Sequence, residues 1–506
     1  MTHSSKQRAA LVAALVPVVA VMLTSCRDSD MNVTNPNAAT VTSATSDPNA
    51  LQLLANGIII DERATRAGIS DNFVLNVGKF GREAYDFSLA SFFLYRDFLL
   101  GIVSGGVQKV DPASQYAAAE WSQQYKALRD IYNFKKTINS STVLSTAGKS
   151  AALGFAQTFE GMMLLDIAQT RDTLGGIVEI RDNAADLAPF VSRDSLYKYI
   201  LNTLDAGASA LASGGASFPF TLPPGFTSNG VFNTPTGFAQ FNRALKARAA
   251  ANYATAGGGT AAWQAVLTAL QASFLNAGAT TRAALDAGVY NTYGPSPDRT
   301  NDLAIPSDLT LYAHPSFTTD AQKKANGEVD DRYTAKIRTG LNPAAGAPNG
   351  NGPVSLTSTI GFKLWPTIGA SMPIIRNEEL ILLRAEARLA TGDKAGAIAD
   401  INVVRQNSGG LPASTLTTAS STDDILTGIL YEKRYSLMME GSRWIDMRRY
   451  GRLDQLPLDI PSGANKTLQA RVVPIPAGEC TARISKAAST NDATLLGPNG
   501  QNNCAP

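Results

Sequence analysis

Two amphipathic segments joined by Gly392 and Asp393 are the feature that most constrains the fold of this chain. Apolar residues recur at helical spacing on both sides of that junction, namely Leu380, Leu383, Ala387 and Ala390 before it and Ala397, Ile398, Ile401 and Val404 after it. Gly392 suits the left-handed residue that ends one helix, and Asp393 can cap the next. The spacing predicts a helical hairpin close to one tetratricopeptide unit, which cannot bury its apolar face alone.

Charged and apolar side chains are interleaved from Tyr431 to Leu453, and their spacing predicts that this segment is largely one helix. Gly441 lies in its middle, where a glycine costs about 1 kcal/mol relative to alanine, so we expect tight packing or a helix break there. We expect the charges to form ion pairs that tie helices together rather than to catalyse a reaction. The residues of this predicted ion-pair motif are Arg376, Glu379, Glu386, Glu432, Arg434, Glu440, Arg443 and Asp446.

Further helical spacing occurs in the first half of the chain, in segments that cover residues 116–138, 150–168, 192–211, 236–254 and 263–274. Stretches rich in Gly, Pro and Asn lie between the helices, above all residues 212–235 and 286–366. Connections longer than about 15 residues are uncommon in compact domains and often carry binding residues. The sequence predicts a mostly α-helical fold, in which repeat helices (about 116–275 and 372–453) pack against an irregular, loop-rich half.

The N-terminus has the pattern of a lipoprotein signal peptide. Two basic residues precede an apolar run of about fifteen residues that ends in Leu23-Thr24-Ser25-Cys26, and this run is shorter than the roughly 20 residues of a membrane span. We expect cleavage after residue 25, acylation of Cys26, a linker over residues 26–50 and one domain over residues 51–506. An uncleaved anchor and an ordinary secretory signal are the alternatives.

The remaining cysteines agree with an exported protein. The chain has 3 Cys, so Cys480 and Cys504 are left once Cys26 is lipidated. A disulfide between them would close a loop of roughly 25 residues and add about 3 kcal/mol of stability, and free thiols are the alternative. Two cysteines and one histidine outside the leader exclude a zinc site in practice, and we predict neither a metal nor a cofactor.

The charge of the chain excludes some classes of partner. The sequence has 44 Lys plus Arg and 42 Asp plus Glu, and the leader contains two of the basic residues, so the mature protein is formally neutral. This balance gives no general electrostatic reason to bind nucleic acid, and it is compatible with an uncharged ligand.

No constellation of catalytic residues stands out. Glu378 and Glu379 diverge around a helix and are no glycosidase pair, and His314 has no Gly-x-Ser-x-Gly turn to serve. No phosphate-binding loop or dinucleotide fingerprint follows a predicted strand. The sequence therefore predicts a binding protein and not an enzyme.

Three stretches of the C-terminal third resemble the SusD/RagB family of outer-membrane nutrient-binding lipoproteins. The first comprises Pro373-Ile374-Ile375-Arg376, Glu379 and Ala385-Glu386-Ala387; the second comprises Glu432, Lys433, Arg434, Leu437, Glu440, Gly441, Arg443, Trp444 and Asp446, with Arg448 or Arg449; the third runs from Val472 to Cys480. Ser436 stands where the family usually has Glu, and Ser442 where it often has His. The resemblance therefore does not carry over the local side-chain pairs at these two positions.

The resemblance implies a SusD-like fold, in which tetratricopeptide-like repeats support an irregular ligand-binding half. It also implies a location on the cell outer membrane, held by the lipid anchor and exposed at the surface. The implied function is capture of a nutrient, most readily an oligosaccharide, for a TonB-dependent (SusC-like) transporter as partner. Peptide capture by the same fold, a surface scaffold and a surface hydrolase are the alternatives.

Sugars are commonly gripped by aromatic rings together with amide and carboxylate groups. The aromatic candidates for ligand binding in loops are Tyr85, Tyr290, Tyr293, Tyr312 and Trp365. Asn291 and Asp298 lie near two of them in the sequence and are candidate polar partners. Four phenylalanines between residues 218 and 232 form a further apolar group, which we expect to face a partner or the core.

Overall fold

A computed structural model describes residues 47–67, 72–87, 99, 101–104, 107–183, 185–227, 230–295, 298–304, 311–342, 344–346, 356–459, 467–498 and 502–504. The predicted signal peptide, the acylated Cys26 and most of the predicted linker lie outside these ranges. The first helix within the described ranges starts at Pro48, inside the segment predicted to be the linker.

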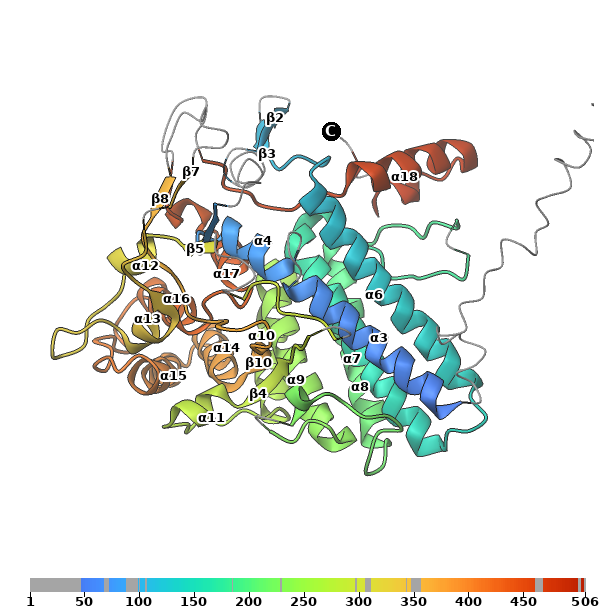
Figure 1. Cartoon of the computed structure of the whole chain (residues 1–506), viewed down its shortest axis with the longest axis horizontal. Helices are drawn as coiled ribbons and strands as arrows, with labels where there is room; N and C mark the ends of the chain where they lie inside the picture. The colour runs from blue at the N-terminus through green and yellow to red at the C-terminus, as the bar shows by residue number, and fades with distance from the viewer. Residues whose placement is uncertain are drawn as a thin grey trace, which may run out of the picture.

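An array of long helices forms one side of the molecule (Figure 1). Its members are α3 (Pro48–Ala67), α6 (Gln115–Ser140), α7 (Thr146–Arg171), α8 (Arg193–Ala212), α9 (Pro235–Tyr253) and α10 (Gly259–Gln271). Each packs on the next in this order, as expected for helical repeats. The helices begin at capping residues that the sequence supplies, because the side chains of Ser145, Ser192 and Thr234 accept hydrogen bonds from the first turns of α7, α8 and α9. The prediction of a mostly helical repeat fold is confirmed.

Aromatic packing fills the core of this array. Phe155 and Phe238 lie on facing helices with ring centroids 5.7 Å apart, and both are fully buried. The four phenylalanines of the connection after α8 point into the same core, where Phe218 and Phe220 stack on each other at 5.4 Å. They face the core, which is one of the two placements that the sequence allowed.

The hairpin predicted around Gly392 and Asp393 is confirmed. Helix α14 (Asn377–Ala390) is followed by α15 (Lys394–Asn407), Gly392 has φ +92°, and Asp393 accepts a hydrogen bond from the backbone of Gly396. Helix α16 (Thr422–Ser436) packs on both, so the three helices bury one apolar cluster.

The prediction of largely one helix from Tyr431 to Leu453 is wrong. Helix α16 ends at Ser436, and α17 (Arg443–Arg449) begins after a break in which Met439 and Gly441 have φ values of +55° and +81°. A Cβ on Gly441 would lie 2.6 Å from the ring of Phe73, so the glycine serves both the break and close packing.

The irregular half contains short strands and helices. Four strands pair in the order β1 (Ala84–Asp86), β5 (Leu311–Ala313), β9 (Gly361–Phe362) and β6 (Ile337–Arg338), and β10 (Met372–Arg376) pairs antiparallel with β4 (Gly288–Asn291). Two further hairpins are β2 (Ile102–Ser104) with β3 (Val107–Lys109) and β7 (Ala344–Gly346) with β8 (Leu356–Ser358). Short helices are α4 (Phe73–Phe80), α11 (Arg282–Asp286), α12 (Ser316–Thr319), α13 (Asp331–Lys336), η3 (Asp172–Leu174), η4 (Pro224–Phe226), η7 (Leu453–Gln455) and η8 (Ala493–Leu495), with a π-helical turn, η5 (Ala254–Gly258), between α9 and α10.

A last helix, α18 (Ala477–Thr490), lies at the edge of the molecule beside the C-terminal end (Figure 1). Cys480 in this helix forms a disulfide with Cys504, 24 residues further along the chain. Within the ranges that the structure covers, none of the helices combines the length and the apolar character needed to cross a membrane.

Candidate functional site

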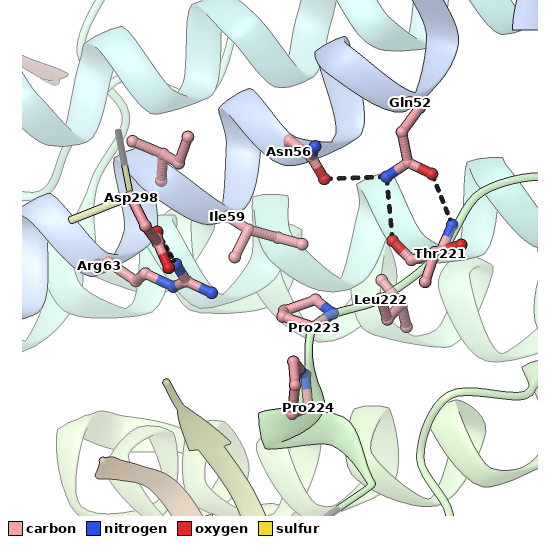
Figure 2. Close-up of a pocket in the computed structure, with 10 residues that line it drawn as sticks. Gln52, Asn56, Ile59, Arg63, Thr221, Leu222, Pro223, Pro224 and Asp298 are labelled. Atoms are coloured by element: carbon pink, nitrogen blue, oxygen red, sulfur yellow. Dashed lines mark hydrogen bonds and ion pairs between the residues drawn. The ribbon is translucent and has the colours of Figure 1, made fainter. Parts of the chain in front are cut away.

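A cavity of about 420 Å³ lies between α3 and the segment that leads into η4 (Figure 2). We call it the α3 cavity. Its lining residues come from three places in the sequence, which are Gln52, Asn56, Ile59, Ile60 and Arg63 on α3, Thr221, Leu222, Pro223 and Pro224 before η4, and Asp298 after β4. The volume falls within the range of about 300–1,000 Å³ that small-molecule sites occupy.

Helix α3 presents one face to this cavity. Gln52, Asn56 and Arg63 are separated by four and seven residues, so they lie on the same side of the helix one and three turns from the first. At 1.5 Å per residue, the eleven steps from Gln52 to Arg63 span about 16 Å. The face is therefore long enough to contact a ligand of more than one ring.

A side-chain amide holds the opposite wall of the cavity. Gln52 Oε1 accepts a hydrogen bond of 2.7 Å from the backbone nitrogen of Thr221, and Gln52 Nε2 donates to the Thr221 oxygen at 3.0 Å and to Asn56 Oδ1 at 2.9 Å (Figure 2). The side-chain amide of Gln52 thus both donates to and accepts from the backbone of Thr221, as a residue does with its hydrogen-bonded partner on a neighbouring β-strand. Because Pro223 and Pro224 have no backbone N–H, the segment cannot be held through their own amides.

An ion pair closes the other end of the α3 cavity. Arg63 Nη1 lies 2.7 Å from Asp298 Oδ1, with the arginine side chain 6% exposed and the carboxylate 45% exposed. Asp298 Oδ1 also accepts from the backbone of Arg299 at 2.8 Å, whereas Asp298 Oδ2 has no hydrogen bond within the described part of the chain. This free oxygen remains available to accept a hydrogen bond from a bound molecule.

A free donor lies two turns away on the same face of α3. Asn56 Oδ1 is used by Gln52, and Asn56 Nδ2 donates to no other residue among those described. Between this donor and Asp298, the wall consists of Ile59, Leu222 and Pro223. The arrangement has no net charge, and it can hold a neutral molecule that has hydroxyl groups along its edges and an apolar face.

The aromatic residues predicted to bind ligand are not gathered at one surface. Tyr85, Tyr293 and Trp365 are 3%, 7% and 3% exposed and belong to the core of the irregular half. Tyr290 and Tyr312 are half-buried, and the hydroxyl of Tyr290 donates to the Asp286 oxygen at 2.6 Å. None of the five lines the α3 cavity, so we do not assign ligand contact to them.

The two polar residues named with these rings have different positions. Asn291 is 2% exposed within β4, whereas Asp298 reaches the α3 cavity. The sequence reasoning missed α3 and its amides. The signal was Asp47-Pro48, a capping residue followed by proline at the first helical position, ahead of Leu51, Ala55 and Ile58 at helical spacing.

The residues of the ion-pair motif are buried or half-buried, and most of their pairs join different helices. Arg376 Nη2 pairs with Glu440 Oε1 at 2.8 Å, and Glu379 pairs with Arg248 at 2.6 Å. Further members pair as Glu386 with Lys433 and Arg449, Glu432 with Arg332 and Arg405, Asp446 with Lys433 and Arg449, and Arg434 with Asp320. Arg443 has no ion pair within 4.0 Å among the described side chains, and burial lowers its pKa to about 9.

His314 occupies a buried network beside the four-stranded sheet. Its Nδ1 lies 2.7 Å from Ser316 Oγ and its Nε2 lies 3.1 Å from Asp459, which also accepts from Tyr85. Burial lowers the pKa of His314, although the carboxylate opposes the shift. The Ser-His-Asp order resembles a hydrolase relay. Ser316 is only 8% exposed, however, and its hydroxyl oxygen already accepts a 2.7 Å hydrogen bond from Arg434.

Metal binding has no support from the side chains seen. Over the portion of the chain that the structure covers, there is no group of three or more His, Cys, Asp or Glu side chains that could hold a metal ion.

Comparisons with known proteins agree with this architecture. The model of the SusD family matches residues 366–493, which contain α14, α15, α16 and α17 and thus the ion-pair motif. The chain has no significant match among curated proteins. The matched segment contains all three stretches that resemble the SusD/RagB family, so the resemblance predicted from the sequence is confirmed over this part of the chain.

Solved structures show the same fold over most of the chain. A SusD-like carbohydrate-binding protein of Bacteroides fragilis is 14% identical, with a TM-score of 0.61 over 87% of this chain and 99% of that one. NanU of B. fragilis is 16% identical, with a TM-score of 0.57 over 84% and 93%. A SusD superfamily protein of Parabacteroides distasonis is 13% identical, with a TM-score of 0.62 over 86% and 97%.

Proposed function

We propose that this chain is a surface nutrient-binding protein that captures a neutral oligosaccharide in the α3 cavity. The observation that carries the proposal is the cavity itself, with a free amide donor and a free carboxylate oxygen on either side of an apolar wall. Similar structures include a protein named as carbohydrate-binding and another named as a putative sugar-binding protein. The match of residues 366–493 to the SusD family supports a role in nutrient binding.

Recognition would use both kinds of group in the cavity. Asn56 Nδ2 donates to a hydroxyl, Asp298 Oδ2 accepts from another, and the proline and aliphatic side chains contact the C–H face of a sugar ring. Asn56 and Arg63 are seven residues apart, or about 10 Å along the helix, so the contacts suit two linked rings better than one. The ion pair between Arg63 and Asp298 leaves no net charge to attract an acidic ligand.

The cellular part of the proposal rests on the family resemblance. The protein would be anchored to the outer membrane through Cys26, exposed at the cell surface, and would deliver its ligand to a TonB-dependent transporter without chemical change. Capture of a peptide by the same cavity remains the alternative. A native pull-down from solubilised outer membrane would recover a transporter of this class, and recovery of the protein alone would contradict delivery.

Ligand capture can be tested by calorimetric titration of the full chain against a panel of neutral oligosaccharides and, in parallel, short peptides. We expect an oligosaccharide to bind, and Asn56→Ala to weaken it by about 3- to 10-fold, the loss of one hydrogen bond. The matched control is Asn139→Ala, which removes an exposed asparagine of α6 outside the cavity. Binding of peptides alone, or equal affinity in Asn56→Ala and wild type, would overturn the assignment.

A further inference from the structure

A second cavity of about 420 Å³ lies beside α18. In Figure 1, α18, β2, β3 and the C-terminal end lie together along the top edge, whereas α3 runs down to the lower right. We call this second space the α18 cavity. It shares no lining residue with the α3 cavity, and nothing in the proposed function uses it.

The walls of the α18 cavity are mainly apolar. Ala477, Cys480, Thr481 and Ile484 follow one another at intervals of three, one and three residues, so one face of α18 forms a wall. The apolar side chains of the other walls are Val110, Pro112, Leu174, Val472, Pro474 and Ile475. Ile484 is 48% exposed at this face, a degree of exposure that leaves apolar surface open to water.

The C-terminal tail is fixed in place as a further wall. The disulfide joins Cys504 to α18, the backbone of Asn503 donates to the Leu496 oxygen at 2.9 Å, and Asn503 Nδ2 donates to the Leu174 oxygen at 2.5 Å. Asn503 and Cys504 both line the cavity. The cavity is therefore a built feature whose shape depends on one covalent bond and on specific hydrogen bonds.

Lys109, which lines the α18 cavity, has no ion-pair partner among the described residues. The ammonium group of Lys109, at the end of β3, has neither a hydrogen bond nor an ion pair with the part of the chain that the structure describes. No acidic residue lines the cavity, and Glu479, the one carboxylate of α18, is paired with Arg483 at 2.6 Å. Thr481 Oγ1 is occupied with the Ala477 oxygen at 2.9 Å. The electrostatic complement of this site is a single negative charge.

We propose that the α18 cavity binds a small amphiphile with one anionic head group, which pairs with Lys109, and one unbranched apolar tail, which packs against the apolar walls. An apolar cavity of this size with few polar groups is typical of small-molecule sites, and the uncompensated lysine selects the charge of the head. Because the tail residues Asn503 and Cys504 are held by the disulfide, binding depends on the oxidised protein.

The test is calorimetric titration of the full chain with dodecanoate below its micellar concentration. We expect one molecule per chain, a loss of about tenfold or more in Lys109→Ala, and no binding of dodecyltrimethylammonium, which has the same tail and the opposite charge. Lys486→Ala is the matched control, because Lys486 lies on α18 but does not line the cavity, and its affinity should stay within about twofold of wild type. Equal losses in the two lysine variants would overturn the role of Lys109.

A second pair of variants tests the cavity itself. Thr481→Trp fills the space from an exposed position and should abolish binding, whereas Ala482→Trp places the same ring on the next residue, outside the cavity, and should leave it unchanged. Melting curves show whether each variant is folded. Binding that persists in Thr481→Trp, binding of many dodecanoate molecules per chain, or no binding by the wild type would each overturn the proposal. Reduction of the disulfide in folded wild type should weaken binding, and unchanged affinity would contradict the dependence on the oxidised tail.

Discussion

Lys433 Nζ lies 2.8 Å from Glu386 Oε1, and both side chains are buried although they are 47 residues apart in the sequence. Glu386 also accepts from Arg449 and from the Tyr450 hydroxyl, the latter at 2.7 Å. Helices α14, α16 and α17 therefore meet at one carboxylate. Removal of this carboxylate would leave its partners as buried, uncompensated charges. Its loss therefore destabilises the protein by more than the net interaction energy of the ion pairs.

Replacement of Glu386 by alanine should destabilise the protein by about 3–5 kcal/mol, since Lys433 and Arg449 would lose a buried counter-charge. The free energy of unfolding in urea measures the effect. Glu179→Ala is the control, because Glu179 pairs with Arg181 at the surface, with side chains 54% and 39% exposed, and such pairs contribute less than about 1 kcal/mol. Similar losses of unfolding free energy in both variants would mean that the buried ion pairs of Glu386 stabilise the protein no more than the exposed pair does.

The buried carboxyl group of Glu83 makes the free energy of unfolding depend on pH. Burial raises the pKa of this fully buried carboxyl from 4.5 to about 7, against the opposing hydrogen bond from the Met439 backbone. A raised carboxyl pKa means that the folded state binds the proton more tightly. The stabilisation is therefore complete below about pH 4.5 and is lost as the pH rises through 7.

Glu83→Gln should remove this dependence. Between pH 4.5 and pH 8, the wild type should lose up to about 3 kcal/mol more unfolding free energy than the variant, since one pKa unit corresponds to about 1.4 kcal/mol. Urea unfolding at several pH values tests the difference. If the unfolding free energies of the two proteins changed with pH in parallel, protonation of Glu83 would not be the cause of the pH dependence.

Alanine substitutions at Gly441 and Gly451 distinguish the energetic cost of backbone strain from that of crowding. Both have positive φ, +81° and +69°, but an added Cβ would lie 2.6 Å from the Phe73 ring at Gly441 and would meet nothing within 4 Å at Gly451. Gly451→Ala should cost about 1 kcal/mol from backbone strain, and Gly441→Ala about 1–3 kcal/mol more from overpacking. Equal melting temperatures for the two variants would mean that Phe73 moves aside freely.

The sequence predicted those parts of the fold that local chemistry determines. Gly392 and Asp393 end one helix and begin the next through their own conformational preferences, so the hairpin could be predicted. Gly441 indicated tight packing or a helix break, and both occur, but the end of α16 at Ser436 could not be located. The ring that crowds Gly441 belongs to Phe73, more than 360 residues earlier in the chain, and no local pattern shows that contact.

The candidate site was harder to predict for the same reason. Aromatic residues in loops were an appropriate expectation for a sugar site, but Tyr85 is held in the core by the pairing of β1 with β5, which is distant in sequence, and Trp365 is buried beside the ring of Phe362. Of the residues that line the α3 cavity, Asp298 alone was named individually, although Thr221 to Pro224 lie within the loop region 212–235 that was expected to carry binding residues. The cavity exists only where α3 meets the segment before η4, and no local pattern shows that Gln52 faces Thr221, 169 residues away.

Gln52 offers the sharpest test of how the α3 cavity is built. The Thr221 amide is held by Gln52 Oε1 at 2.7 Å, so Gln52→Ala should release the wall before η4 and speed hydrogen exchange at that amide. Ligand affinity should fall as well, by about tenfold, because the wall must then be ordered on binding. Asn56→Ala serves as the matched variant, since it removes a contact to the ligand but leaves both hydrogen bonds between Gln52 and Thr221 in place. We expect weaker binding in both variants and faster exchange at Thr221 in Gln52→Ala alone. Slow exchange at Thr221 in Gln52→Ala would show that other contacts hold the wall, and the loss of affinity would then need a different cause.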